Sequence, residues 1–293
     1  MDELLERVLG VGDQDLRANI ITNFEGLNNM VRMTPKSVEH ACTVIRKSHG
    51  PPEARTITPV LESRLKMLAN TAKYRYVVQR PVLDYPSYTL GRMQFIWDWF
   101  TQLDDDPEDS MVKPFTEKGS KKLWFEAVNC YLSTKKGKSG YPIQYVIRPM
   151  SALPHPADFQ DPGFCMPSIS DELYRRGRHD GHFWIGDRRE VWNLYFLKVH
   201  DTIAWGEIKI FGVNKNGRQA HVAMVARFMG QDVKRVLAKQ AKEALLNLRY
   251  DNKSKNFTYP NFLARMRNAF EDGEHKSGRP RWLTCWMPSK SRP

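Results

Sequence analysis

The stretch TPVLESRLKMLANTA, residues 58–72, opens with two helix-start signals and continues with the period of a helix. Thr58 can cap the free backbone N–H groups of a first turn, and a proline at the next position already has a helical φ angle. The apolar residues that follow recur every three or four positions, as in an amphipathic α-helix. The same Thr-Pro pair stands at residues 34–35, and helical spacing also marks residues 16–27 and 90–100. We therefore expect the first hundred residues to be helical.

The acidic segment DDDPED, residues 104–109, is the clearest boundary in the sequence. Five acids around a proline cannot pack into a core, so they predict a loop or linker. Beyond it, residues 141–148 (YPIQYVIR) are rich in β-forming residues and predict an extended segment. Residues 149–182 contain five prolines and no hydrophobic period, which predicts an irregular connection. Apolar stripes elsewhere in this half predict helices; they lie at residues 123–132, 191–199, 220–228, 233–248 and 257–270.

The resulting prediction is a mostly α protein with two helical domains. The N-terminal helical domain is expected at residues 1–103 and the acidic linker at 104–115. The second helical domain is expected at 116–293, with the irregular segment 149–182 and a basic C-terminal tail. Within the helices, Cys130 falls among apolar residues and is expected to be a buried, unreactive thiol. Three aromatic residues on apolar stripes are expected in the core: Trp124, Trp192 and Phe196.

Composition excludes several classes of protein. Hydrophobic residues make up 41% of the chain and aromatic residues 11%, which is too apolar for a disordered chain. Mean hydropathy is −0.57, and no apolar run approaches the roughly 18 residues of a membrane span, so we expect no membrane partner. The acidic first ten residues do not resemble a secretory signal. The four cysteines lie far apart, so we expect reduced thiols and a cytoplasmic location.

The net charge of +12 is concentrated near the C-terminus. Residues 206–293 contain 18 Lys or Arg against 7 Asp or Glu, a net charge of +11, whereas residues 1–30 contain six acids and two arginines. A basic segment of this strength attracts polyanions such as RNA. A solvated helix face that only keeps the chain soluble is the alternative explanation.

Enzyme signatures are sparse. There is no P-loop or G-x-G-x-x-G motif, so we expect no nucleotide cofactor. Asp187, followed about twenty residues later by Glu207 and Lys209, resembles the pattern of metal-dependent nucleases, in which carboxylates hold Mg²⁺ and a lysine helps activate water. That alternative requires Glu207 and Lys209 on a strand. His179 and His182 could be metal ligands, but zinc needs three or four, so two solvated imidazoles are expected and no metal.

Three further stretches carry a family resemblance: KKLWFEAVNCYLSTKKGKSGYPIQYVIR at 121–148, GRQAHVAMVARFMG at 217–230, and AKEALLNLRYDNKSKNFTYPNFLARM at 241–266. Their order resembles the Gag-like proteins of retrotransposons, particularly those encoded in unicellular algal genomes. The resemblance implies an all-helical capsid-type domain that self-associates and packages the RNA of the element. The chain departs from the fuller Gag pattern because it lacks a C-x₂-C-x₄-H-x₄-C zinc knuckle; Cys285 is its only C-terminal cysteine.

Charge and resemblance together favour a non-enzymatic Gag-like protein that forms homo-oligomers and binds RNA without sequence preference, in a salt-dependent manner. The rival hypotheses are the metal-dependent nuclease that uses Asp187, Glu207 and Lys209, and a helical adaptor that binds protein partners. The residues expected to contact phosphates are basic residues of the C-terminal third: Arg227, Lys234, Arg235, Lys239, Lys242, Lys253, Lys255, Arg279 and Arg281.

Overall fold

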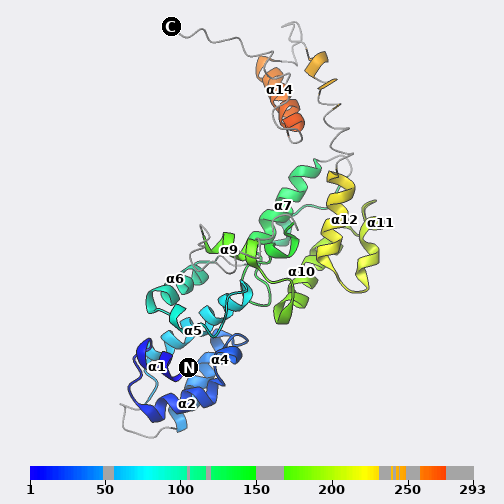
Figure 1. Ribbon diagram of the computed structural model, residues 1–293. Helices are drawn as coiled ribbons and strands as arrows, with labels where there is room; N and C mark the ends of the chain where they lie inside the picture. Colours follow the sequence, from blue (N-terminus) through cyan, green and yellow to red (C-terminus); the bar gives the residue numbers. More distant parts are fainter. Residues whose placement is uncertain are drawn as a thin grey trace, which may run out of the picture. The chain divides into compact units, whose positions relative to one another are not determined.

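The computed structural model describes residues 1–48, 56–103, 106–116, 120–149, 168–230 and parts of 239–274. These residues are mostly helical, which confirms the expected mostly α fold (Figure 1). Among them there is no strand, and one isolated bridge joins Lys136 and Pro142. The α-helices are α1 (Asp2–Arg7), α2 (Gln14–Phe24), α3 (Leu27–Met30), α4 (Pro35–Ser48), α5 (Pro59–Val77), α6 (Leu90–Thr101), α7 (Lys121–Thr134), α9 (Ile169–Arg176), α10 (Gly181–Val199), α11 (Trp205–Ile208), α12 (Gly217–Met229) and α14 (Tyr259–Glu274). The 3₁₀ helices are η2 (Tyr85–Ser87), η3 (Asp109–Met111), η4 (Gln144–Ile147) and η6 (Lys209–Gly212).

The chain forms two compact units, residues 1–221 and 222–293, and α12 begins in the first and ends in the second. Both sides of the acidic segment 104–115 belong to the first unit, so the division between units lies elsewhere. Asp106 of that segment accepts hydrogen bonds from Lys135 Nζ and from the backbone N–H of Lys136, each at 2.9 Å. The expectation of two separate domains joined by a linker at 104–115 stays a prediction.

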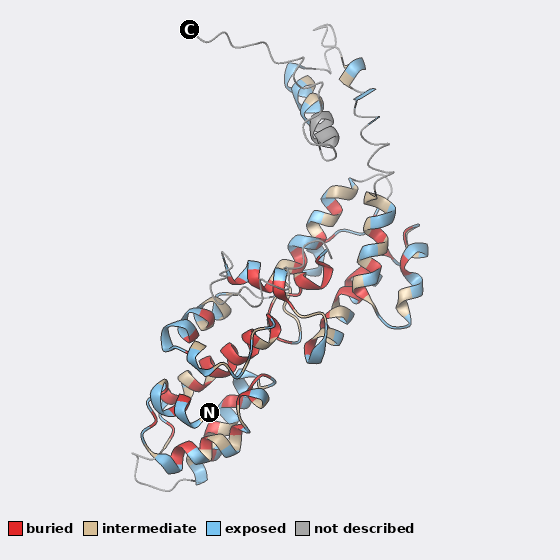
Figure 2. Cartoon of the chain, in the orientation of Figure 1, coloured by how far each residue is buried: buried red, intermediate tan, exposed pale blue. Residues whose placement is uncertain are grey.

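Helix α5 is the centre of packing for the N-terminal helices. It packs against α3, α4 and α6, and much of it is buried (Figure 2). Leu65, Leu68 and Ala72 are fully buried. Because neighbours surround it on several sides, polar residues of α5 such as Asn70 are buried as well. Its start confirms the expected cap, since Thr58 Oγ1 accepts a hydrogen bond of 3.1 Å from the backbone N–H of Leu61.

The second Thr-Pro pair also begins a helix. Thr34 Oγ1 accepts a hydrogen bond from the backbone N–H of Ser37 at 3.1 Å, and Ser37 Oγ accepts one from the backbone N–H of Thr34 at the same distance. These reciprocal bonds satisfy two N–H groups at the start of α4 that have no partner within the helix. Val38, Cys42 and Ile45 then form its buried face.

Aromatic residues join α7, α10 and the start of α12. The Trp124 ring lies edge-on to the Tyr195 ring, with centroids 5.8 Å apart, and Tyr195 Oη lies 2.6 Å from His221 Nδ1. Trp124 and Trp192 are buried, as expected. The prediction for Phe196 is wrong: this side chain is 45% exposed, because it lies one step beyond the buried arc of α10. Its ring is tilted against His200 and lies edge-on to Trp205.

Helix α12 starts where its backbone meets that of α10. A Cβ atom on Gly217 would lie 2.6 Å from the carbonyl oxygen of Arg188 and 2.7 Å from the carbonyl carbon of Val191. These are backbone atoms that cannot rotate away, so only glycine fits here. The next residue, Arg218, donates hydrogen bonds of 2.9 Å to the carbonyl oxygens of Val146 and Arg148. The helix expected at residues 220–228 is therefore confirmed, and it begins three residues earlier, at Gly217.

The expectation of an extended segment at 141–148 is wrong. Residues 144–147 form the 3₁₀ helix η4, which packs against α7, α9 and α10. Tyr141, just before it, is fully buried, and its hydroxyl donates a hydrogen bond of 2.9 Å to Asn70 Oδ1. Tertiary burial overrides the local preference for β structure, because no neighbouring strand is present among the described residues to pair with this segment.

The prediction that residues 149–182 are irregular is wrong for the last part of this segment. Residues 169–176 form α9, and α10 begins at Gly181. Ser168 caps α9, because its Oγ accepts a hydrogen bond of 3.0 Å from the backbone N–H of Asp171. Arg175 and Arg176 stand at the last turn, where cations interact favourably with the helix dipole. Residues 150–167 lie outside the described residues.

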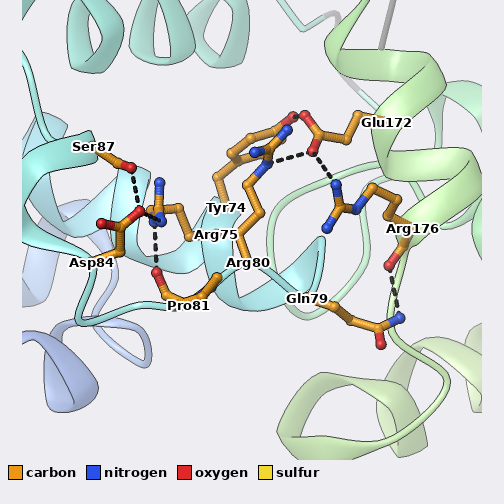
Figure 3. A network of polar contacts seen from close by, with 9 residues as sticks. All are labelled: Tyr74, Arg75, Gln79, Arg80, Pro81, Asp84, Ser87, Glu172 and Arg176. Atoms are coloured by element: carbon orange, nitrogen blue, oxygen red, sulfur yellow. Dashed lines mark hydrogen bonds and ion pairs between the residues drawn. The ribbon is translucent and has the colours of Figure 1, made fainter. Parts of the chain in front are cut away.

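A buried carboxylate fastens α9 to α5 (Figure 3). Glu172, which is 7% exposed, accepts hydrogen bonds of 2.6 Å from the Tyr74 hydroxyl and from Arg80 Nε. Arg176 Nη1 lies 3.7 Å from the same carboxylate. Gln79 Nε2 adds a hydrogen bond of 3.0 Å to the carbonyl oxygen of Arg176. We call these five residues the Glu172 network.

A second set of bonds in the same view holds the turn after α5 (Figure 3). Arg75 is buried and donates hydrogen bonds of 2.8 Å to the carbonyl oxygen of Pro81 and to Asp84 Oδ2. Ser87 also donates to Asp84. Arg75 and its neighbours pull the pKa of the Asp84 carboxyl below its usual value: the Ser87 hydrogen bond contributes most, and Arg75 adds its charge. Both sets of bonds thus act on the C-terminal end of α5.

Candidate nucleic-acid interface

Three of the expected phosphate contacts lie in the described part of the chain. Arg227 is exposed on α12, and Lys239 and Lys242 are exposed on residues with helical backbone. Lys239 and Lys242 are three positions apart, a spacing that brings them to one helix face. Lys239 Nζ lies 4.0 Å from Glu243 Oε1, a weak surface ion pair. The other six lie outside the described residues: Lys234, Arg235, Lys253, Lys255, Arg279 and Arg281.

The division into compact units sharpens the charge asymmetry. The second unit, residues 222–293, contains fifteen Lys or Arg against six Asp or Glu, a net charge of +9. The first unit, three times as long, carries the remaining +3. Within the second unit, α14 adds Arg265 and Arg267, and both are exposed. A polyanion is therefore attracted mainly to residues 222–293.

Two arginines of the first unit donate hydrogen bonds to backbone carbonyl groups. Arg148 is 1% exposed, and its Nη1 donates to the carbonyl oxygens of Tyr174 and Arg175 at the C-terminal end of α9. Arg218 donates in turn to the carbonyl oxygens of Val146 and Arg148. Burial and the nearby Arg218 charge lower the pKa of Arg148 to about 10. These cations satisfy the ends of helices and are not part of the candidate interface.

Asp187 is the most buried acid of the described chain, at 0% exposed. Its Oδ1 accepts a hydrogen bond of 2.6 Å from the backbone N–H of Lys138, and its Oδ2 accepts one of 2.7 Å from the Tyr145 hydroxyl. Burial raises the pKa of Asp187 to about 6, against these two hydrogen bonds, which lower it. The carboxyl therefore fastens the turn after α7 to α10, and it has no contact with solvent.

The structure does not meet the requirement of the nuclease hypothesis that Glu207 and Lys209 lie on a strand. Glu207 lies on α11 and Lys209 on η6, so the strand through residues 205–213 that this alternative requires does not form. The apolar residues of this segment are buried at helical spacing: Ala204 and Ile208 are buried and Trp205 is half-buried. This spacing explains why the segment is helical. Asp187 is enclosed while Glu207 and Lys209 are exposed, so the three do not form one solvent-accessible site.

We expect the Asp187→Asn variant to gain stability relative to the wild type as pH rises. The folded chain holds the Asp187 proton more tightly than the unfolded chain, whose carboxyl has a pKa near 3.8. The stabilisation by Asp187 is therefore fully present below pH 3.8 and is lost as pH rises through about 6. Asparagine stays neutral, so its advantage should grow by about 2–3 kcal/mol between pH 4 and pH 7. Urea denaturation of both proteins across this range measures the difference; a difference independent of pH would contradict it.

Two further side chains differ from their sequence predictions. His179 is not solvated: its ring stacks on Trp184 at 4.6 Å, and its Nε2 lies 2.8 Å from the carbonyl oxygen of Tyr145. Burial lowers its pKa to about 4. His182 is exposed, as expected. The prediction for Cys130 is wrong, since it lies on the exposed face of α7 and is a free thiol.

Sequence reasoning did not find the interlocked polar groups around Arg148, Tyr145 and Asp187. Their partners are 26 to 49 residues away along the chain, and each residue alone has no distinctive spacing.

No described group of three or more His, Cys, Asp or Glu is placed to hold a metal ion. Within the described residues, none of the helices has the length and apolar character needed to cross a bilayer. In comparisons with known proteins, no family model, no curated protein and no solved structure matches the chain.

Proposed function

We propose that this chain is a non-enzymatic, Gag-like assembly protein that binds RNA through its basic C-terminal surface and associates with copies of itself. The observation that carries the proposal is the net charge of +9 in residues 222–293, with Arg227, Lys239 and Lys242 exposed. RNA presents one phosphate per nucleotide, and lysine and arginine side chains gain affinity by displacing its counterions. Binding of this kind depends on backbone charge rather than sequence.

Support for self-association comes from the segment around α11 and η6. Three large aliphatic side chains there are exposed: Ile203 is 64%, Ile210 is 67% and Val213 is 91% exposed. Aliphatic groups that stay in water within one short segment are typical of protein contact sites. All three belong to the first compact unit, whereas the basic residues proposed to contact RNA belong to the second.

Reversing four lysines of the second unit should weaken RNA binding at least tenfold at low salt. The variant carries Lys239→Glu, Lys242→Glu, Lys253→Glu and Lys255→Glu. Each lost phosphate contact also reduces the slope of log affinity against log salt by about 0.7 for a single strand. Fluorescence anisotropy with a labelled single-stranded RNA, repeated at several salt concentrations, measures both quantities.

A control variant with the same change in net charge separates a local site from overall charge. Lys36, Lys47, Arg92 and Lys113 are exposed in the first unit and are changed to glutamate. The proposal expects this control to bind RNA more tightly than the test variant. Equal RNA affinities for the wild type, the test variant and the control would show that the basic surface is not the RNA-binding site. Light scattering of the same preparations reports association: a clean monomer free of nucleic acid at low and high salt would favour the adaptor hypothesis.

A further inference from the structure

Helix α14 carries an apolar stripe that begins with two stacked aromatic rings. The rings of Tyr259 and Phe262 have their centroids 6.1 Å apart and an interplanar angle of 19°. Leu263 and Met266 continue the same side of the helix at the following turn. Tyr259 is 53% exposed and Leu263 is 38% exposed, and no described residue of α14 is buried (Figure 2). The stripe therefore has water-accessible aromatic surface.

Positive charge borders this stripe on both sides. Helical geometry, at 100° per residue, places Arg265 on one flank and Arg267 on the other. Both arginines are exposed. The sequence contains no acidic residue from 252 to 270, whereas it contains Lys253, Lys255, Arg265 and Arg267. The next acidic residue in the sequence is Glu271, nine positions after Phe262.

This combination of aromatic rings and flanking cations favours single-stranded RNA over a protein partner. Every nucleobase has a π face that stacks on tyrosine or phenylalanine, and the phosphates beside it pair with lysine or arginine. An apolar helix face meant for a protein partner needs no cations on both flanks, and burying them without carboxylates would cost stability. Duplex RNA offers no unstacked base to the rings, so the charge and the rings together point to single strands.

We propose that α14 is a stacking platform for single-stranded RNA, with Tyr259 and Phe262 holding a base and Arg265 and Arg267 contacting the adjacent phosphates. This assignment rests on the proposed RNA-binding function and adds a base contact to it. A stacked base resists salt, because no counterion competes for the ring. Affinity for single-stranded RNA should therefore fall less steeply with salt than affinity for a polyanion that has no bases.

The test compares Tyr259→Ala with Tyr259→Phe in the full chain, using labelled oligouridine RNA and heparin as the two probes. Loss of the ring should weaken RNA binding about tenfold, whereas the phenylalanine variant keeps the ring and should stay within twofold of the wild type. Heparin has charge but no bases, so neither variant should change its binding. Phe95→Ala, which removes a 64% exposed ring from α6, is the matched control and should change neither affinity.

The outcomes separate this inference from the proposed function. If the wild type binds no RNA, the proposed function fails and this assignment with it. If RNA binds and the lysine reversals weaken it while Tyr259→Ala does not, the function stands and the platform is wrong. A change in oligomer mass without a change in RNA affinity would make α14 a protein contact instead. Ultraviolet cross-linking of 4-thiouridine RNA to the folded wild type, mapped by mass spectrometry, should identify Tyr259 or Phe262; cross-links confined to other segments would overturn the assignment.

Discussion

Replacing Gly217 by alanine should destabilise the first compact unit by about 3 kcal/mol. The new methyl group would meet the backbone of α10 at three points, the closest being the backbone nitrogen of Trp192. Backbone atoms inside a helix cannot turn aside as a side chain does, so α12 would have to shift. That shift would also strain the hydrogen bonds of Arg218 to the carbonyl groups of Val146 and Arg148. Urea denaturation monitored by circular dichroism measures the loss.

Gly91→Ala is the matched control for Gly217→Ala. Gly91 lies in the first turn of α6, and a Cβ there would have no neighbour within 4 Å. Alanine has a higher helix propensity than glycine, so this variant should be more stable than the wild type by about 0.5–1 kcal/mol. If both variants changed stability in the same direction and by the same amount, the close approach of α12 to α10 would not be the cause.

Replacing Glu172 by alanine should cost about 3–5 kcal/mol, the second large effect. The carboxylate receives the Tyr74 hydroxyl and Arg80 Nε, and it lies beside Arg176, whose side chain is 4% exposed. Without Glu172, the buried positive charge of Arg176 and the Tyr74 hydroxyl lose this acceptor. Glu172→Gln keeps an oxygen for the tyrosine but no charge, so it should lie between alanine and the wild type. Denaturant midpoints give the order.

Hydrogen exchange should show where that stability is lost. In Glu172→Ala, the amides of α9 should exchange faster than those of α4. Helix α9 is joined to α5 through the Glu172 network, whereas the apolar face of α4 and its ion pairs with α5, such as Arg46 with Glu62, do not involve Glu172. Glu3→Ala removes a carboxylate from an ion pair in which both side chains are more than two-thirds exposed, and it should change stability by less than about 0.5 kcal/mol. An equally small effect for Glu172→Ala would mean that the network contributes nothing net.

The parts of the fold that depend on neighbouring residues could be predicted from the sequence. Thr34 and Thr58 cap helices with bonds that span three residues, so their effect is visible in a short window. Phe196 shows the limit of the same reasoning. Helical periodicity identifies an apolar stripe, but the width of the buried arc depends on what packs against it, and Phe196 lies just outside.

Features that depend on distant residues could not be predicted. The 141–148 segment has β-forming residues, yet Tyr141 bonds Asn70, 71 positions earlier, and Tyr145 bonds Asp187, 42 positions later. No local pattern contains these partners. The candidate interface is intermediate: the charge of residues 222–293 is visible in composition, whereas the stacking of Tyr259 on Phe262 and the exposure of both arginines required coordinates.

The Glu172 network has a consequence for the order in which the chain acquires its structure. Arg80 and Glu172 are 92 residues apart, and a ribosome adds roughly 5–20 residues each second. Arg80 and the N-terminal helices before it are therefore synthesised roughly 5–20 seconds before the carboxylate that α5 requires. During that interval the Tyr74 hydroxyl and the Arg80 guanidinium form hydrogen bonds with water. These two groups lose their bound water only when α9 packs against α5, and this packing is the last step in completing the environment of α5.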